Sequence, residues 1–152
     1  MSIQDGACEE SVLKAAKWLC SPPQPTWRES FSAMFMELFA SIRTHHQKMT
    51  TPVLVRVDDE NRAYSMMFQV DDTFEATAAD NASSLTILRM KDMRVRSATF
   101  GGYVNEEACR QQLKSLLETC ALSQPPSVWY VAVYNGPYRL WGRTNKVMFE
   151  IK

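Results

Sequence analysis

Apolar residues recur at steps of three and four along two stretches of the chain, and this spacing predicts two amphipathic helices. Thr26 can cap the first helix, because Glu29 follows at the spacing of a capping box. Asn105 is a good cap for the second. The first apolar stripe is formed by Trp27, Phe31, Met34, Phe35, Leu38 and Ile42. The second is formed by Cys109, Leu113, Leu116, Leu117 and Cys120.

Alternation of apolar and polar residues predicts β-strands elsewhere. The segments TPVLVRV and YSMMFQV, with polar residues between them, predict a hairpin over residues 52–70. The polar segment DDTFEATAADNASS is expected to be irregular. Further strands are predicted at residues 85–90, 93–99, 128–134 and 146–151.

The order of these elements repeats. Helix, strand, strand occurs twice, and the two helix caps are 79 residues apart. Because a strand precedes the second helix, the repeat predicts a strand at about residues 11–20, although Val12, Ala16 and Leu19 have helical spacing. Two βαββ units give an α+β fold with a mostly antiparallel sheet and helices packed on it. A groove between the halves is a natural place for an apolar ligand.

Composition and charge narrow the function classes. A chain of 152 residues suits one domain, 1–152, in which residues 1–7 are expected to be flexible. Seventeen basic and seventeen acidic residues cancel, so general nucleic-acid binding is not expected. No signal peptide or membrane span is predicted. We therefore expect a cytoplasmic monomer with its four cysteines reduced, Cys109 being a core residue.

Little in the sequence points to catalysis. No phosphate-binding glycine loop and no G-x-S-x-G elbow is present, so an enzyme is not expected. The acid pairs Asp58–Asp59 and Asp71–Asp72 are interpreted as solvated turn residues. His45, His46 and Met49 can all ligate a metal, but a solvated polar connection is the simpler interpretation.

Three segments resemble the SOUL/haem-binding-protein family: KMTTPV, VRSATFGGYVNEEA and VWYVAVYNGPYRLWGRTNKVMF. The last is the most specific, with alternating aromatic residues, Tyr-Asn-x-Pro, a basic residue and then x-x-x-Arg-x-Asn-x-Val. The resemblance covers roughly residues 8–152. It is closer to the haem-binding-protein branch because of FGGY and GRTN.

The resemblance implies a distorted eight-stranded antiparallel barrel flanked by two helices. It also implies reversible, non-covalent binding of haem or related tetrapyrroles in a shallow apolar groove, without known catalysis. The first helix and the loop before the last strand border that groove, and their basic residues meet the propionates. The matching candidates here are Phe31, Phe35, Leu38, Arg43, Tyr138, Arg139 and Trp141. Met36 and Phe39 lie off the helix stripe and add apolar surface that could line a groove.

The chain departs from the family at several positions. Ser32 and Ala40 stand where some members carry basic residues on the first helix, and Arg28 and Arg43 are possible substitutes. Val12 stands where some members have a histidine proposed as axial ligand. The connection RTHHQK is shortened, so His45 or His46 is a candidate axial haem ligand without a family counterpart.

These departures leave alternatives open. The first hypothesis is a carrier or buffer for haem or porphyrin. The second is a diverged member that has lost haem binding and acts as a protein-interaction or signalling module. A third is that the groove binds another flat apolar ligand.

Overall fold

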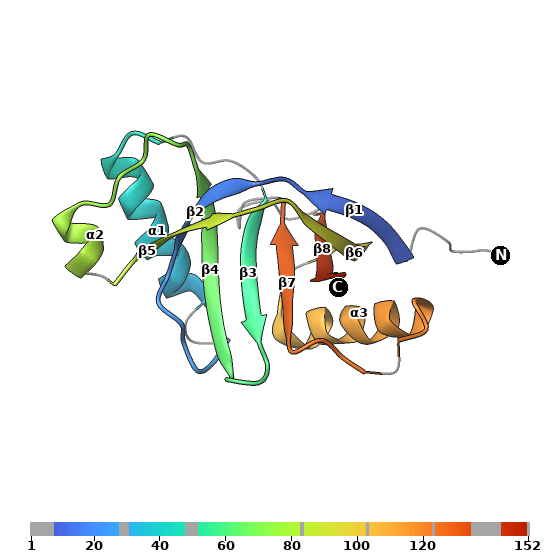
Figure 1. Ribbon diagram of the computed structural model, residues 1–152. Coiled ribbons are helices and arrows are strands. Elements are labelled where there is room, and N and C mark those ends of the chain that lie inside the picture. The colour runs from blue at the N-terminus through green and yellow to red at the C-terminus, as the bar shows by residue number, and fades with distance from the viewer. Residues whose placement is uncertain are drawn as a thin grey trace.

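The chain folds around an antiparallel sheet of eight strands in the order β1-β6-β8-β7-β3-β4-β2-β5 (Figure 1). A computed structural model describes residues 8–27, 31–47, 52–82, 84–102, 104–122, 124–134 and 144–151, except the side chains of residues 31–33 and 81. The strands are β1 (Glu9–Leu13), β2 (Ala16–Cys20), β3 (Val53–Asp58), β4 (Ala63–Val70), β5 (Thr86–Met90), β6 (Met93–Phe100), β7 (Val128–Val133) and β8 (Asn145–Glu150). The helices are α1 (Phe31–Thr44), α2 (Ala78–Ala82) and α3 (Glu106–Thr119).

A two-stranded ribbon curls the sheet into a half-barrel. Strands β1 and β2 lie opposite β6 and β5 in one continuous register, in which Glu9 faces Ser97 and Ala16 faces Met90. At one end of the ribbon β6 pairs with β8, and at the other end β2 pairs with β4. The ribbon therefore joins the two edges of the sheet β4-β3-β7-β8, and Figure 1 shows it crossing above those strands.

The two halves of the chain repeat the same pairing. Lys17 pairs with Val70, and 79 residues later Arg96 pairs with Phe149. In each half a strand of the ribbon is followed by a long helix and a hairpin. The α+β fold with duplicated βαββ units is thus confirmed. The predicted strand at residues 11–20 is also confirmed, as β1 and β2.

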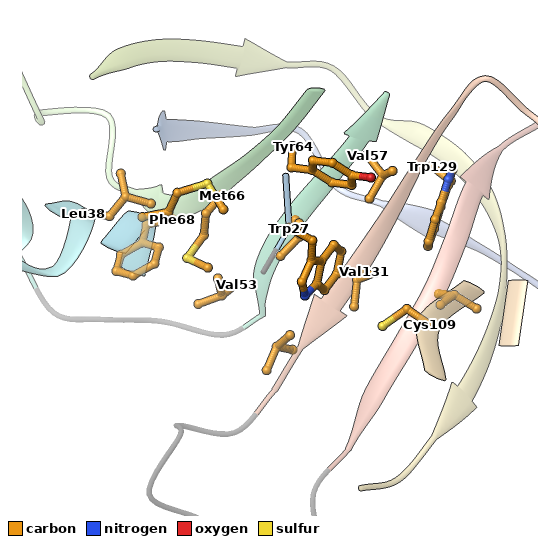
Figure 2. Packing of buried hydrophobic residues seen from close by; sticks show 14 of the residues in the cluster. Trp27, Leu38, Val53, Val57, Tyr64, Met66, Phe68, Cys109, Trp129 and Val131 are labelled. Carbon is orange, nitrogen blue, oxygen red and sulfur yellow. The ribbon is translucent and has the colours of Figure 1, made fainter. Parts of the chain in front are cut away.

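The core has two parts, one on each face of the sheet. Because side chains alternate along a strand, neighbours such as Val53 and Leu54 belong to different faces. The larger part lies between the sheet and helices α1 and α3, and Figure 2 shows Leu38 and Cys109 reaching it from those helices. The smaller part is centred on Trp18, Leu54, Met67, Tyr130 and Met148. Each large side chain buried in this way contributes roughly 1.5–3 kcal/mol.

The long helices follow the predicted stripes, with one difference at the start of α1. Helix α1 is described from Phe31 onward, and Trp27 lies in a bend before it. There the Trp27 ring is buried and packs edge-on against Tyr64 at 5.9 Å between ring centroids. The predicted capping box includes Glu29, which lies outside the described residues. In α3 the cap is confirmed, because Asn105 Oδ1 accepts a hydrogen bond from the Ala108 N–H at 2.9 Å.

Two expectations about local structure are wrong. The segment 71–84 is not wholly irregular, because α2 forms within it around Asp80, whose carboxylate accepts the Thr77 N–H at 2.8 Å. The cysteines are not all reduced, because Cys8 and Cys120 form a disulfide across 112 residues. No C-x-x-C spacing marks this pair in the sequence, in which the two cysteines are 112 residues apart.

The other two cysteines are free thiols. Burial raises the pKa of Cys20 to about 11 and that of Cys109 to about 12. Cys109 is fully buried on α3, which confirms its predicted core position. No helix within the described ranges is long and apolar enough to cross a membrane.

Candidate functional site

One side of α1 carries apolar side chains that the core covers only in part. Phe35 and Phe39, one helical turn apart, are half-buried and stack at 5.8 Å with 17° between their planes. Phe35 is supported from the sheet by Phe68 at 5.4 Å. Met36 keeps 60% of its surface exposed. The Arg43 guanidinium carbon lies 5.8 Å from the centre of the Phe39 ring.

We call Phe35, Met36, Phe39 and Arg43 the α1 patch. Helical spacing explains it, because residues three and four apart share one side of a helix. The patch flanks the buried stripe, in which Leu38 is fully enclosed. An apolar surface with a cation at one end can bind a flat apolar molecule that carries an anionic group.

The predicted site residues separate into three groups. Phe35 and Arg43 lie together in the α1 patch, and Leu38 lies behind it in the core. Phe31 is in the first turn of α1, and its side chain is not described. Tyr138, Arg139 and Trp141 lie outside the described residues.

The two adjacent histidines end helix α1. His46 adopts a left-handed backbone with φ 55°, and its N–H donates to the Arg43 carbonyl. The Gln47 N–H donates to the Ile42 carbonyl at 2.8 Å. These two hydrogen bonds form a Schellman motif, in which glycine usually occupies the position of His46. His46 therefore lies in the turn that ends α1, and its side chain is exposed to solvent.

His45 is bound to the short helix α2. Its Nε2 lies 2.9 Å from Asp80 Oδ2, and its ring packs on Phe74 at 4.2 Å between centroids. Ser41 Oγ donates to the other carboxylate oxygen of Asp80 at 2.6 Å. Burial tends to raise the pKa of Asp80, but the hydrogen bonds from Ser41, Thr77 and His45 outweigh it and hold that pKa below its usual value.

A second polar cluster, which the sequence did not predict, lies at the start of α3. The Arg110 guanidinium donates to both Asp59 oxygens at 2.9 and 3.2 Å, and to Glu106 at 3.0 Å. The Tyr64 hydroxyl donates to Glu106 at 2.8 Å, and the Trp129 indole N–H donates to Asp59 at 2.9 Å. The hydrogen bonds that Arg110 donates to Asp59 are the largest cause of a raised pKa at Arg110. Asp59 is therefore the exposed turn residue that was expected, and it is also an ion-pair partner, whereas its neighbour Asp58 is buried.

The residues that line the surface beside this cluster are all charged or polar. A shallow depression of about 440 Å³ on α3 is lined by Glu106, Glu107, Arg110, Gln111 and Lys114. No aromatic residue lines it, in contrast to the α1 patch. Within the part of the chain that the structure describes, no three His, Cys, Asp or Glu side chains gather into a metal site.

Comparison with known proteins identifies related sequences and folds. A family model described as SOUL heme-binding protein matches residues 2–150, nearly the whole chain. No curated protein sequence matches. Three solved structures share the fold at 9–10% identity, each covering 95% of this chain.

The three structures differ in their described roles. One is SAV2435 bound to tetraphenylphosphonium, with TM-score 0.59 over 93% of its chain. The second is a putative transcription regulation protein from Staphylococcus aureus MU50, with TM-score 0.60 over 97% of its chain. The third is a hydrolase from Listeria innocua, with TM-score 0.57 over 91% of its chain. At this identity they establish the fold alone.

Proposed function

The chain belongs to the SOUL heme-binding protein family, and we propose that it binds haem or a related tetrapyrrole reversibly and without covalent attachment. In this proposal the protein is a carrier or buffer that acts in the cytoplasm as a monomer, and it is not an enzyme. The observation that carries the proposal is the α1 patch, where the exposed Met36 and the half-buried rings of Phe35 and Phe39 lie next to a cation.

The patch fits the chemistry of a porphyrin. A porphyrin face is a large apolar plate that Phe35, Met36 and Phe39 can cover. Its two carboxylates favour a guanidinium, and Arg43 lies at the end of the aromatic pair. We assign a second cation to Arg139, with Tyr138 and Trp141 as flat surfaces beside it, on the strength of the sequence motif.

Iron ligation has less structural support than contact with the porphyrin face. The Nε2 of His45 is engaged by Asp80, so ligation through this atom would break that hydrogen bond. His46 is exposed and is the better candidate for an axial ligand. We therefore propose that most of the affinity comes from the apolar plate and the carboxylates.

Parallel titrations with hemin and metal-free protoporphyrin test this proposal. We expect a saturable, roughly one-to-one change in the Soret band for both ligands at micromolar concentrations, with similar affinities. Much tighter binding of hemin would assign the affinity to iron ligation instead. The absence of a saturable change with either ligand would refute tetrapyrrole binding.

Another flat apolar ligand is the second candidate. The structural neighbour SAV2435 was solved with tetraphenylphosphonium, a lipophilic cation. The positive charge of Arg43 beside the aromatic pair favours an anionic ligand over such a cation. Saturable binding of tetraphenylphosphonium, together with a flat hemin titration, would favour the second candidate.

A further inference from the structure

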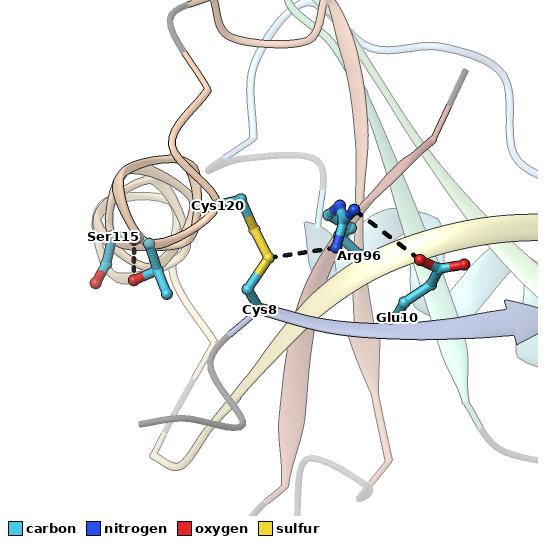
Figure 3. Close-up of a disulfide and its surroundings, with 6 residues drawn as sticks. Cys8, Glu10, Arg96, Ser115 and Cys120 are labelled. Carbon is cyan, nitrogen blue, oxygen red and sulfur yellow. Dashed lines mark hydrogen bonds and ion pairs between the residues drawn. A yellow bond between two sulfur atoms is a disulfide. The ribbon is translucent and has the colours of Figure 1, made fainter. Parts of the chain in front are cut away.

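The disulfide joins two parts of the fold that are far apart in sequence. Cys8 immediately precedes β1, and Cys120 is the C-cap residue of α3 (Figure 3). Both residues are half-buried, so neither is enclosed in the core. The four described residues Glu9–Val12 that follow Cys8 are mostly exposed, so no core packing covers this end of β1.

The two sulfur atoms have unequal surroundings. Arg96 Nη1 lies 3.5 Å from Cys8 Sγ and points a positive charge at it (Figure 3). Glu10 competes only weakly for Arg96, because its ion pair with Arg96 spans 3.9 Å whereas it contacts Arg94 at 2.6 Å. A neighbouring guanidinium favours the thiolate over the thiol.

Cys120 has the opposite environment. It lies at the C-terminus of α3, where the helix dipole is negative and disfavours a thiolate. The last turn of α3 contains no basic residue. The backbone at Cys120 is fixed, because its N–H donates to the Leu116 carbonyl and Ala121 follows with a left-handed φ of 56°. When the disulfide opens, Cys8 is therefore the better leaving group.

We propose that the Cys8–Cys120 disulfide is a thiol-exchange site, opened by a glutathione-class thiol with Cys8 leaving as a thiolate paired with Arg96. The attacking thiolate forms a bond with Cys120 Sγ, and the sulfur–sulfur bond breaks with its electron pair on Cys8 Sγ. A second thiol then displaces Cys120 from the mixed disulfide. Two thiols are oxidised to one small disulfide, and the protein gains two electrons and two protons.

Thiol exchange would replace the covalent link between Cys8 and Cys120 with a reactive thiol at Cys8. After reduction β1 remains paired with β6, and the ion pair between Glu10 and Arg94 still supports it. Cys8 then lies beside an exposed strand as the thiol most open to modification. The buried thiols Cys20 and Cys109, whose pKa values are raised, stay unreactive.

Reduction of the folded protein is the first test. The oxidised protein is incubated with millimolar reduced glutathione, freed of glutathione by desalting and labelled with N-ethylmaleimide at about pH 7 without denaturant, and the labels are located by peptide mass spectrometry. We expect labels at Cys8 and Cys120 and none at Cys20 or Cys109. A disulfide that resists glutathione until a denaturant is added would overturn the proposal.

Two arginine variants test the role of Arg96. In the reduced protein, brief iodoacetamide pulses at about pH 7 should alkylate Cys8 faster than Cys120. Arg96→Gln should slow Cys8 alkylation on the order of three- to tenfold. Arg89→Gln is the matched control, because it removes an exposed cation from the neighbouring strand β5 that pairs with Asp72 rather than with Glu10 or Cys8, and it should change the rate less than about twofold. Equal rates at the two cysteines, or equal effects of the two variants, would overturn the proposal.

Discussion

At the scale of single residues, a few polar side chains hold the helices to the rest of the fold. Asp80 binds Ser41 and His45 of the α1 region to α2, and Arg110 binds α3 to Asp59 at the β3–β4 turn. Asp80 is almost fully buried, so the loss of its charge would leave hydrogen-bond donors unsatisfied.

Asp80→Asn should therefore destabilise the protein and reduce its sensitivity to acid. The pKa of Asp80 is lowered in the folded state from its usual 3.8, so its contribution is complete above that value and is lost as the pH falls through the lowered pKa. At about pH 7 we expect the variant to lose about 1–3 kcal/mol of unfolding free energy in urea denaturation. The difference from wild type should shrink at the acid end of the pH series.

Asp72→Asn is the control for this experiment. Asp72 belongs to the same connection between β4 and β5, but its side chain is 85% exposed and pairs with the exposed Arg89. It should change stability by less than about 0.5 kcal/mol. If Asp80→Asn behaved like Asp72→Asn at every pH, the α2 contact would have no energetic role.

The sequence identified His45 and His46 but not what they do. The simpler interpretation placed both histidines in a polar connection. The left-handed backbone of His46 at the end of α1 agrees with it. The partner of His45 could not be predicted, because Asp80 is 35 residues away on a helix too short to give a periodic signal. The same limit applies to Asp59 and Arg110, which are 51 residues apart.

At the scale of elements, β1 is the strand with the least support from the core. Its residues are mostly exposed, and β6 is the strand with which it pairs. The disulfide closes a loop of 112 residues between β1 and the end of α3. A crosslink of this span stabilises a protein mainly by restricting the unfolded chain.

Cys120→Ser should lower the unfolding free energy by about 2–4 kcal/mol in the absence of reductant. The measurement is urea denaturation, with Cys8→Ser and the double variant as controls that remove the same crosslink. All three variants should share one midpoint, and wild type with dithiothreitol should approach it. An unchanged midpoint in all three would mean that the disulfide does not restrict the unfolded chain.

The sequence predicted which helices and strands form better than it predicted the residues at which they begin and end. Helix α3 was predictable because its cap, charges and apolar stripe agree. Trp27 continued the stripe of α1 in sequence, yet it lies in a bend and packs on Tyr64. Burial of a large aromatic ring against the sheet outweighed helical periodicity there.

At the scale of the whole molecule, duplication explains the half-barrel. Each half supplies one strand of the ribbon, one long helix and one hairpin, and the two halves share one register. The repeat could be recognised in the order of the predicted elements. It correctly predicted a strand at about residues 11–20, where the local spacing of apolar residues favours a helix. The disulfide was not visible, because it depends on the distance between β1 and α3 in the folded chain.

The same geometry leaves α1 with more apolar surface than the sheet can cover. Met34, Leu38 and Ile42 face the core, whereas Met36 points away from it with 60% of its surface exposed. Leu88 on β5 is exposed to a similar degree, at 42%, but lies outside the α1 patch. These two residues therefore provide a matched pair for a binding test.

Hemin titration of wild type, Met36→Glu and Leu88→Glu tests most directly whether the α1 patch binds a tetrapyrrole. Both variants add one negative charge at an exposed apolar position, so neither should disturb the core. We predict saturable binding with the same Kd for wild type and Leu88→Glu. Met36→Glu should weaken binding by about tenfold or more, or about 1.4 kcal/mol, because its carboxylate faces the plate and repels the propionates. One Kd for all three proteins, or no saturation in wild type, would contradict the proposed site.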